Sequence, residues 1–322
     1  MVLRSKEGLN MQTTLPEILV RIVKMDGNDE TEINADNYSV RLFKPTTISS
    51  AFQCYEVHID KDSVDTDEYD VPEVFVAKIG QEKADREGGI LQNLYEKGLS
   101  VPKVYGRPAW GNSRVSINII LEEFFQGHTL FEDGSRESWL QFATALAEFH
   151  KGLWNKNTGV ASPRIRDRVN AASWFANRYR QYIPTCKTAL SIVDRCTRTF
   201  LHGDLVPTNV MISAGEVKFI DLNDGGTDPY VLDIARAISC VDPVTIERCC
   251  PEPEEFCRAY YESMQDQLGS FEKFRKNVRA AEFLECSALA QGVISIRPTA
   301  PLEIKYADYM LARVKEQAER LA

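Results

Sequence analysis

One short stretch of the chain combines the side chains that phosphoryl transfer requires. His202, Asp204 and Asn209 form the pattern His-x-Asp-x-x-x-x-Asn, and Asp221 ends the apolar run that follows. This spacing is typical of sites that move phosphoryl groups. Such a site needs oxygen ligands for Mg²⁺ and a carboxylate that orients an attacking hydroxyl group or accepts its proton.

Two short apolar runs, 210–212 and 217–220, flank the sequence Ser-Ala-Gly-Glu and predict a tight β-hairpin. Asn209 stands where the first strand begins and Asp221 where the second ends, so both side chains are expected to reach one Mg²⁺ ion. Asp204 would lie on the preceding loop, beside the metal. Alone, each residue is commonly a cap or turn residue, and only the set indicates a site.

The N-terminal part is predicted to be rich in β-strands. The runs 38–43, 53–59 and 74–79 favour three antiparallel strands, and 101–106 and 115–125 favour two more. A short Gly-containing connector follows the last run, which indicates a lobe boundary. We therefore expect an N-terminal lobe over residues 1–125 and a C-terminal lobe over residues 126–322.

Lys78 lies inside an apolar strand, where an ammonium group either snorkels to water or needs an anionic partner. The following segment, 82–97, has helical periodicity that places Glu87 on the apolar face. A lysine on a buried strand and a carboxylate on the next helix predict an ion pair, the arrangement that holds nucleotide phosphates in protein kinases.

Two loops of the N-terminal part are open to different interpretations. Segment 44–52, with Ser49 and Ser50, could bring backbone N–H groups to phosphate oxygens or could be an ordinary hairpin turn. The acidic segment 58–73 lacks the Gly and Glu of a calcium loop, which favours a solvated hairpin loop.

The C-terminal part has mainly helical patterns. They cover 138–154, 171–182, 185–196, 254–268, 271–291 and 302–321. His150, on the first of these, is expected to be a packed or capping residue. The basic segment 161–170 is interpreted as a solvated loop, with an anion or substrate contact as the alternative. The late acidic residues could line a pocket for a cationic acceptor or form solvated helix faces; they are Glu252, Glu254, Glu255, Glu282 and Glu285.

The amino-acid composition limits the classes of binding partner that we expect for this protein. The net charge of −9 disfavours nucleic acid and anionic membranes and suits a small neutral or cationic substrate. No apolar run approaches ~18 residues and no signal peptide is apparent, so we expect a cytoplasmic protein. Eight cysteines without a Cys-x-x-Cys pair, and four histidines, favour neither a zinc site nor a disulfide framework.

The segments 202–209 and 219–235 resemble the two signatures of the aminoglycoside phosphotransferase/choline kinase-like family, and the resemblance extends over about residues 38–265. These are small-molecule kinases. The resemblance implies an α+β, protein-kinase-like two-lobe fold, with a small antiparallel β lobe containing one helix and a larger, mainly helical lobe.

The resemblance also implies roles. Asp204 matches the catalytic aspartate, Asn209 and Asp221 match the Mg²⁺ ligands, and Lys78 matches the phosphate-contacting lysine with Glu87 as its partner.

Backbone near Glu122, Glu123 and Phe124 would bind adenine, and Ser49 and Ser50 fall in the nucleotide loop, which here has no glycine.

Two positions depart from the family's pattern, because Val206 and Thr208 stand where His and Gly are frequent. Asp233 matches a position that supports the catalytic loop.

The sequence thus predicts transfer of the γ-phosphoryl group of ATP, or another nucleoside triphosphate, with Mg²⁺, to a hydroxyl of a small molecule such as an aminoglycoside-like antibiotic, amino alcohol or sugar. The alternatives are a catalytically silent nucleotide-binding protein of this fold and a kinase of protein side chains. The sequence predicts neither the acceptor nor the oligomeric state.

Overall fold

The structure is a computed structural model that describes residues 13–26, 32–42, 53–66, 69–80, 82–112, 115–156 and 158–321. Ser49 and Ser50 lie outside the described residues. The chain forms two compact units. Unit 1 is Met1–Gln92 with Pro102–Phe125, and unit 2 is Asn93–Val101 with Gln126–Ala322. The short segment Asn93–Val101, which the sequence placed in the N-terminal lobe, thus groups with unit 2.

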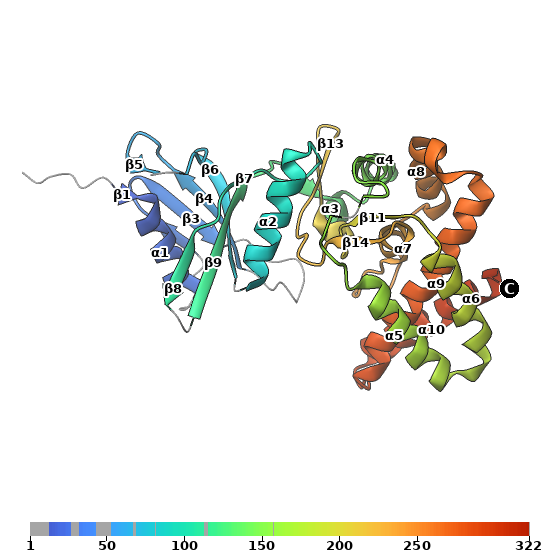
Figure 1. The fold of residues 1–322 in the computed structure, drawn as a ribbon. Helices are drawn as coiled ribbons and strands as arrows, with labels where there is room; N and C mark the ends of the chain where they lie inside the picture. Colours follow the sequence, from blue (N-terminus) through green and yellow to red (C-terminus); the bar gives the residue numbers. More distant parts are fainter. Residues whose placement is uncertain are drawn as a thin grey trace, which may run out of the picture. The chain divides into compact units, whose positions relative to one another are not determined.

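Unit 1 is built on one antiparallel sheet (Figure 1). Among the described residues its strand order is β2-β3-β4-β6-β9-β7, and β8 also pairs with β9. The strands are β2 (Glu32–Asn34), β3 (Tyr38–Leu42), β4 (Gln53–Ile59), β6 (Val74–Gly80), β7 (Val104–Gly106), β8 (Ala109–Asn112) and β9 (Val115–Glu123). The predicted strands are confirmed, and a short parallel pair, β1 (Thr13–Thr14) with β5 (Val64–Asp65), adds to them.

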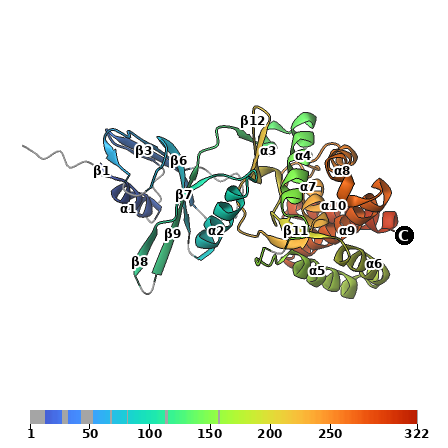
Figure 2. The same cartoon turned by 45° about the horizontal axis from the view of Figure 1, so that its top comes forward.

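One face of this sheet is covered by α1 (Leu15–Asp26), as Figure 2 shows. Leu15, Ile18 and Ile22 recur at helical spacing and are fully buried in the same cluster as Val57 and Phe75 of the sheet. The second helix, α2 (Glu82–Glu96), follows β6 directly, which confirms the predicted helix. This succession fixes Lys78 and Glu87 on consecutive elements.

Unit 2 is mainly helical, and its helices gather around α9 (Figures 1 and 2). They are α3 (Leu130–Asp133), α4 (Arg136–Gly152), α5 (Arg164–Arg178), α6 (Ile183–Asp194), α7 (Val231–Ser239), α8 (Pro253–Leu268), α9 (Phe271–Ser295) and α10 (Pro301–Leu321). Helix α9 contacts α5, α6, α7, α8 and α10. The interpretation of 161–170 as a loop is wrong beyond Pro163, because α5 begins at Arg164 and buries Arg168.

Short strand pairs in unit 2 carry the polar motif. Strand β11 (Arg198–Leu201) pairs with β14 (Gly226–Pro229), and β12 (Val210–Ser213) pairs with β13 (Glu216–Phe219) and β10 (His128–Thr129), all antiparallel. The predicted hairpin β12–β13 is confirmed, and both turn residues, Ala214 and Gly215, have positive φ, as the right-handed twist of a two-residue hairpin favours.

Phe219 anchors this hairpin to the helices. Its ring lies 5.1 Å from that of Phe149 and 6.1 Å from that of Phe142, both on α4. All three rings are buried. The end of β13, where Asp221 follows, is therefore fixed by the core of unit 2.

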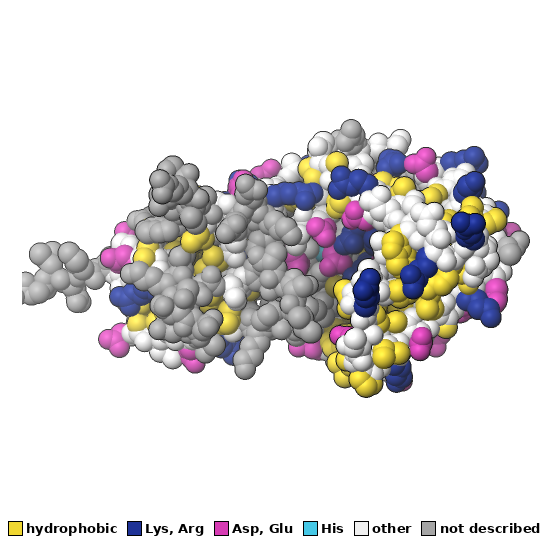
Figure 3. Space-filling model, turned by 90° about the horizontal axis from the view of Figure 1, so that it is seen from below, with side chains coloured by type: hydrophobic (Ala, Val, Ile, Leu, Met, Phe, Trp, Pro, Cys, Tyr) yellow, Lys and Arg dark blue, Asp and Glu magenta, His cyan; other side chains and the backbone are white. Residues whose placement is uncertain are grey.

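Among the described residues, no helix is both long and apolar enough to cross a membrane. On the face seen in Figure 3, acidic and basic side chains are interspersed with apolar ones. The net negative charge is thus not gathered into one acidic patch on the part of this face that the structure describes.

Candidate active site

The loop after β11 is held by a buried carboxylate. Asp233 of α7 accepts hydrogen bonds from the backbone N–H groups of His202, at 2.7 Å, and Gly203, at 3.1 Å. Gly203 has a φ of +89°, and a Cβ atom there would lie 2.2 Å from the backbone oxygen of Asp224. Only glycine fits this turn, so the loop leading to Asp204 has one defined path.

Two histidines complete this support. His202 Nε2 lies 2.8 Å from the Ile220 carbonyl and donates to it, so Nδ1 accepts the backbone N–H of Asp204 at 3.3 Å. His150 is fully buried, with Nδ1 2.8 Å from the Tyr260 hydroxyl and Nε2 3.3 Å from Asp233. The expectation that His150 is a packed residue is confirmed.

Burial raises the pKa of Asp233, but the hydrogen bond and charge of His150, together with His202, outweigh it and hold the pKa below its ordinary value. Asp233 therefore stays ionised and keeps accepting both backbone N–H groups.

Asn209 and Asp221 stand at the open end of the hairpin, as predicted. The Ile220 N–H donates to the Asn209 carbonyl at 3.0 Å, which continues the β12–β13 pairing by one residue. Asn209 Nδ2 donates to the backbone oxygen of Asp204 at 2.9 Å, so its Oδ1 remains as an acceptor. Asp221 has a φ of +60° and accepts from Asn223 Nδ2 at 2.6 Å through Oδ1. Aspartate is among the non-glycine residues that adopt this left-handed conformation most readily.

The side chains of Asn209 and Asp221 carry the type of oxygen that Mg²⁺ prefers as a ligand. Each offers one hard oxygen, Asn209 Oδ1 and Asp221 Oδ2, that takes no hydrogen bond from the described residues. In the described chain no group of three or more His, Cys, Asp or Glu side chains forms a metal site. Mg²⁺ commonly uses one or two protein oxygens and completes its shell with phosphates and water, which two ligands would allow.

Asp204 lies between two arginines. Its Oδ1 is 3.0 Å from Arg236 Nη2 and 3.2 Å from Arg164 Nη2. In the described residues both ion pairs use Oδ1, so Oδ2 remains on a side chain that is 37% exposed. Burial raises the pKa of Asp204, but the charges of Arg236 and Arg164 outweigh it, and the pKa lies below its ordinary value. Asp204 is a carboxylate with one oxygen clamped and one available.

The two arginines belong to a larger group that sequence reasoning missed. Arg236 also lies 3.4 Å from Glu285 on α9, and Arg168 binds Glu285 through Nη2 at 2.5 Å and Nε at 2.6 Å. Burial raises the pKa of Glu285, and Arg168, Arg236 and Arg164 outweigh it, so that its pKa is lowered. Helices α5, α7 and α9 are thus tied together beside Asp204.

The late acidic residues are mostly neutralised by arginines. Glu285 and Glu282 are each 1% exposed, so their interpretation as a solvated face is wrong. Glu282 and Glu254 pair with Arg275, and Glu255 pairs with Arg136. Glu252 is exposed at the start of α8. These carboxylates are therefore committed to the fold more than to a cationic ligand.

In unit 1, Lys78 lies between two carboxylates. Its Nζ is 2.9 Å from Glu87 and 3.3 Å from Glu122, and all three side chains are buried. The predicted pair with Glu87 is present, whereas the contact of the Glu122 side chain was missed. Lys78 pairs with Ile120 across β6 and β9, so Glu122 is a diagonal neighbour on the same face of the sheet.

The proposed adenine-binding backbone lies where β9 ends. Glu122 pairs with both β6 and β7, and the Glu123 side chain accepts the backbone N–H of Lys103 at 3.1 Å. Phe124 follows the strand. The adenine contacts of these three residues stay a prediction.

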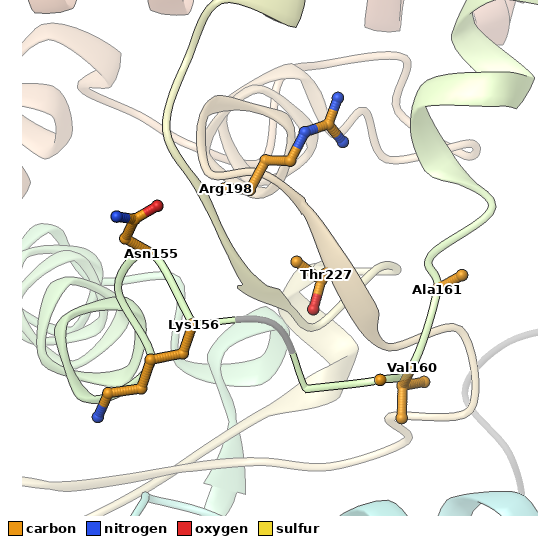
Figure 4. A pocket seen from close by; sticks show the side chains of 7 residues that line it. Asn155, Lys156, Val160, Ala161, Arg198 and Thr227 are labelled. Atoms are coloured by element: carbon orange, nitrogen blue, oxygen red, sulfur yellow. The ribbon is translucent and has the colours of Figure 1, made fainter.

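A cavity of about 460 Å³ lies elsewhere in unit 2 (Figure 4). None of the predicted site residues reaches it, and its described lining is Asn155, Lys156, Gly159, Val160, Ala161, Arg198 and Thr227. Lys156 and Arg198 extend in opposite directions in Figure 4, and Arg198 pairs with Asp228 and Asp194. These cations do not converge on a common ligand.

The fold and the paired motifs define a phosphotransferase of the kinase-like type. The family model described as "Phosphotransferase enzyme family" matches residues 74–271, and the chain belongs to this family. Comparison with curated proteins found no significant match. The α+β fold expected from the sequence is confirmed by the solved structures.

Three of these structures illustrate the likeness. Amicoumacin kinase, solved in complex with AMP-PNP, Ca²⁺ and Ami, has a TM-score of 0.63 at 11% identity, covering 95% of this chain and 96% of that one. An ethanolamine kinase from Plasmodium vivax has a TM-score of 0.57 at 14% identity, covering 96% and 92%. A microcompartment-associated aminopropanol kinase has a TM-score of 0.57 at 15% identity, covering 94% and 100%. At these identities the likeness establishes the fold.

Proposed function

We propose that the protein transfers the γ-phosphoryl group of ATP, or another nucleoside triphosphate, to a hydroxyl group of a small molecule. The observation that carries this proposal is the state of Asp204. It is an ionised carboxylate with one clamped oxygen and one available oxygen, on the loop that also positions Asn209. This arrangement suits a residue that orients an acceptor hydroxyl for in-line attack.

In this proposal Asp204 Oδ2 accepts the hydrogen bond of the acceptor hydroxyl and takes up its proton as the new P–O bond forms. The bond between the γ-phosphorus and the β,γ-bridging oxygen breaks, and the nucleoside diphosphate leaves. Asn209 and Asp221 would hold Mg²⁺, which when bound neutralises phosphate charge. Lys78 would contact the nucleotide phosphates, with Glu87 and Glu122 fixing its ammonium group.

The similar structures support the nucleotide and the kind of acceptor. One is a kinase solved with a nucleotide analogue and a divalent cation, and others are kinases of ethanolamine and aminopropanol. From these structures we infer for this protein only the feature that the acceptors share, which is a small molecule with a free hydroxyl group.

The test is transfer of label from γ-labelled ATP with Mg²⁺ to a panel of aminoglycosides, amino alcohols, sugars, nucleosides and hydroxy acids. The proposal expects labelled product from at least one acceptor and none without Mg²⁺. Nucleotide binding without transfer to any acceptor would support the silent nucleotide-binding alternative. Label appearing only in added proteins would support a protein kinase.

A further inference from the structure

We propose that the acceptor is a small alcohol that also carries an anionic group, a carboxylate or a phosphate, and that Arg164 and Arg236 recognise this group beside Asp204. The inference rests on the proposed function and specifies its substrate class. Its basis is the sign of the charge that surrounds the proposed catalytic carboxylate.

The two guanidinium groups come from different helices and converge on one atom. Arg164 opens α5 and Arg236 lies in α7, and both reach Asp204 Oδ1 within 3.2 Å. Their side chains are 14% and 19% exposed, beside an aspartate that is 37% exposed. An acceptor hydroxyl bound to Oδ2 must therefore place its neighbouring atoms close to both cations.

Arg164 retains hydrogen-bonding capacity. Its Nη2 contacts Asp204 and Asp224, but its buried Nε has no hydrogen-bond partner among the described residues. A guanidinium group has five N–H donors in a planar fork, which suits a carboxylate or phosphate. Arg168 provides the contrast, because its Nε and Nη2 are both used by the buried Glu285. Arg168 is therefore committed to the fold, whereas the donors of Arg164 are not all used by the described residues.

Asp224 only weakly neutralises the positive charge of the two arginines. It is 42% exposed and lies 3.4 Å from Arg164 Nη2, a long contact that a ligand anion can replace. Glu285, the other neighbouring carboxylate, is buried and already held by Arg168 and Arg236. A cationic acceptor at Asp204 would meet two guanidinium groups at short range, and an anionic acceptor would be attracted by them.

Matched acceptor pairs that differ by one anionic group test the proposal. Glycerate and glycerol phosphate are compared with glycerol, and homoserine with 3-aminopropanol, by kcat/KM at saturating MgATP. We expect the anionic member to exceed its partner by at least about 10-fold, and the glycerate and phosphate arms separate the two anion types. Preference for glycerol or 3-aminopropanol overturns this inference and leaves the proposed function standing. If no acceptor of any class is phosphorylated, both this inference and the proposed function are overturned.

A matched pair of variants assigns the effect to Arg164. Arg164→Gln should raise KM for the anionic acceptor by about 10-fold or more, with KM for ATP nearly unchanged. Arg166→Gln removes an exposed arginine of the same helix and should change neither constant. Thermal unfolding of both variants checks that they fold. An equal loss with charged and uncharged acceptors would mean that Arg164 only positions Asp204, and would overturn the proposal.

Discussion

Two ion-pair groups among the described residues have opposite arrangements of charge. In unit 1 a single lysine, Lys78, lies between two buried carboxylates, Glu87 and Glu122. In unit 2 a single carboxylate, Asp204, lies between two arginines and is partly exposed. One group holds a cation inside a packed sheet, and the other presents a carboxylate to solvent with its ionisation secured.

This difference suggests different roles for the two groups, namely positioning of a phosphate by the lysine and recognition of a ligand by the arginines. A buried lysine with two partners has few accessible orientations, which suits a residue that must meet a phosphate at a fixed place. The Asp204 side chain is partly exposed, and the buried Nε of Arg164 has no hydrogen-bond partner among the described residues, which agrees with the proposed ligand site. The comparison agrees with the proposal that the lysine group serves the nucleotide and the arginine group serves the acceptor.

The largest expected effect on stability comes from removing the cation of unit 1. Lys78→Met leaves Glu87 and Glu122 buried without their ammonium partner, which should lower the free energy of unfolding by about 3–5 kcal/mol. It should also lower kcat/KM for ATP by roughly 10- to 100-fold. Denaturant unfolding and steady-state kinetics measure the two effects. Lys61→Met, at an exposed lysine, is the control. A variant as stable and active as the wild type would contradict the positioning role.

Loss of a proposed metal ligand should have the next largest effect, which is on the rate of phosphoryl transfer. Asp221→Asn keeps one oxygen but removes the charge, so kcat should fall by roughly 100-fold and the Mg²⁺ concentration for half-maximal rate should rise. Mg²⁺ titration of the rate measures both. Asp242→Asn, in a surface turn of the same unit, serves as the control. Unchanged Mg²⁺ dependence would show that Asp221 does not hold the metal.

Asp233 should affect stability and, through the loop, activity. Asp233→Asn replaces one of two accepting oxygens by an NH₂ group that faces a backbone N–H of His202 or Gly203. The free energy of unfolding should fall by about 2 kcal/mol. Chemical denaturation tests this value. A stability change close to zero would show that the backbone hydrogen bonds do not hold the loop.

The smallest effect concerns pH. The pKa of Asp233 is lowered in the folded state, so its stabilising contribution is present above the unfolded pKa of about 3.9 and is lost as pH falls through the lower, folded value. The wild type should therefore lose stability below about pH 4 more steeply than Asp233→Asn. Parallel unfolding curves at several acidic pH values measure the slopes, and equal slopes would contradict this assignment.

Local sequence patterns predicted much of the candidate site. The β12–β13 hairpin follows from two short apolar runs around a small-residue turn, and it places Asn209 and Asp221 together without help from distant residues. The Lys78–Glu87 pair follows from strand and helix periodicity on consecutive elements. The side-chain contact of Glu122 depends on the register between β6 and β9, which the sequence alone does not give.

The arginine group could not be read from the sequence for a different reason. Segment 161–170 has the charge density of a solvated loop, and Arg168 is buried only because Glu285, far along the chain on α9, meets it there. Periodicity arguments treat arginine and glutamate as surface residues, so a buried pair between distant helices is interpreted as two exposed faces. Only the packing of α5 and α7 on α9 brings these charges to Asp204.

The most direct test of the central claim is kcat for Asp204→Asn at saturating MgATP and acceptor, with MgATP binding measured separately. Asparagine preserves the shape of the side chain but lacks the negatively charged carboxylate that is proposed to accept the proton. The account predicts a fall in kcat of roughly 100- to 10,000-fold with MgATP affinity nearly unchanged. A variant that turns over at the wild-type rate would contradict the role of Asp204 as the residue that orients the acceptor hydroxyl.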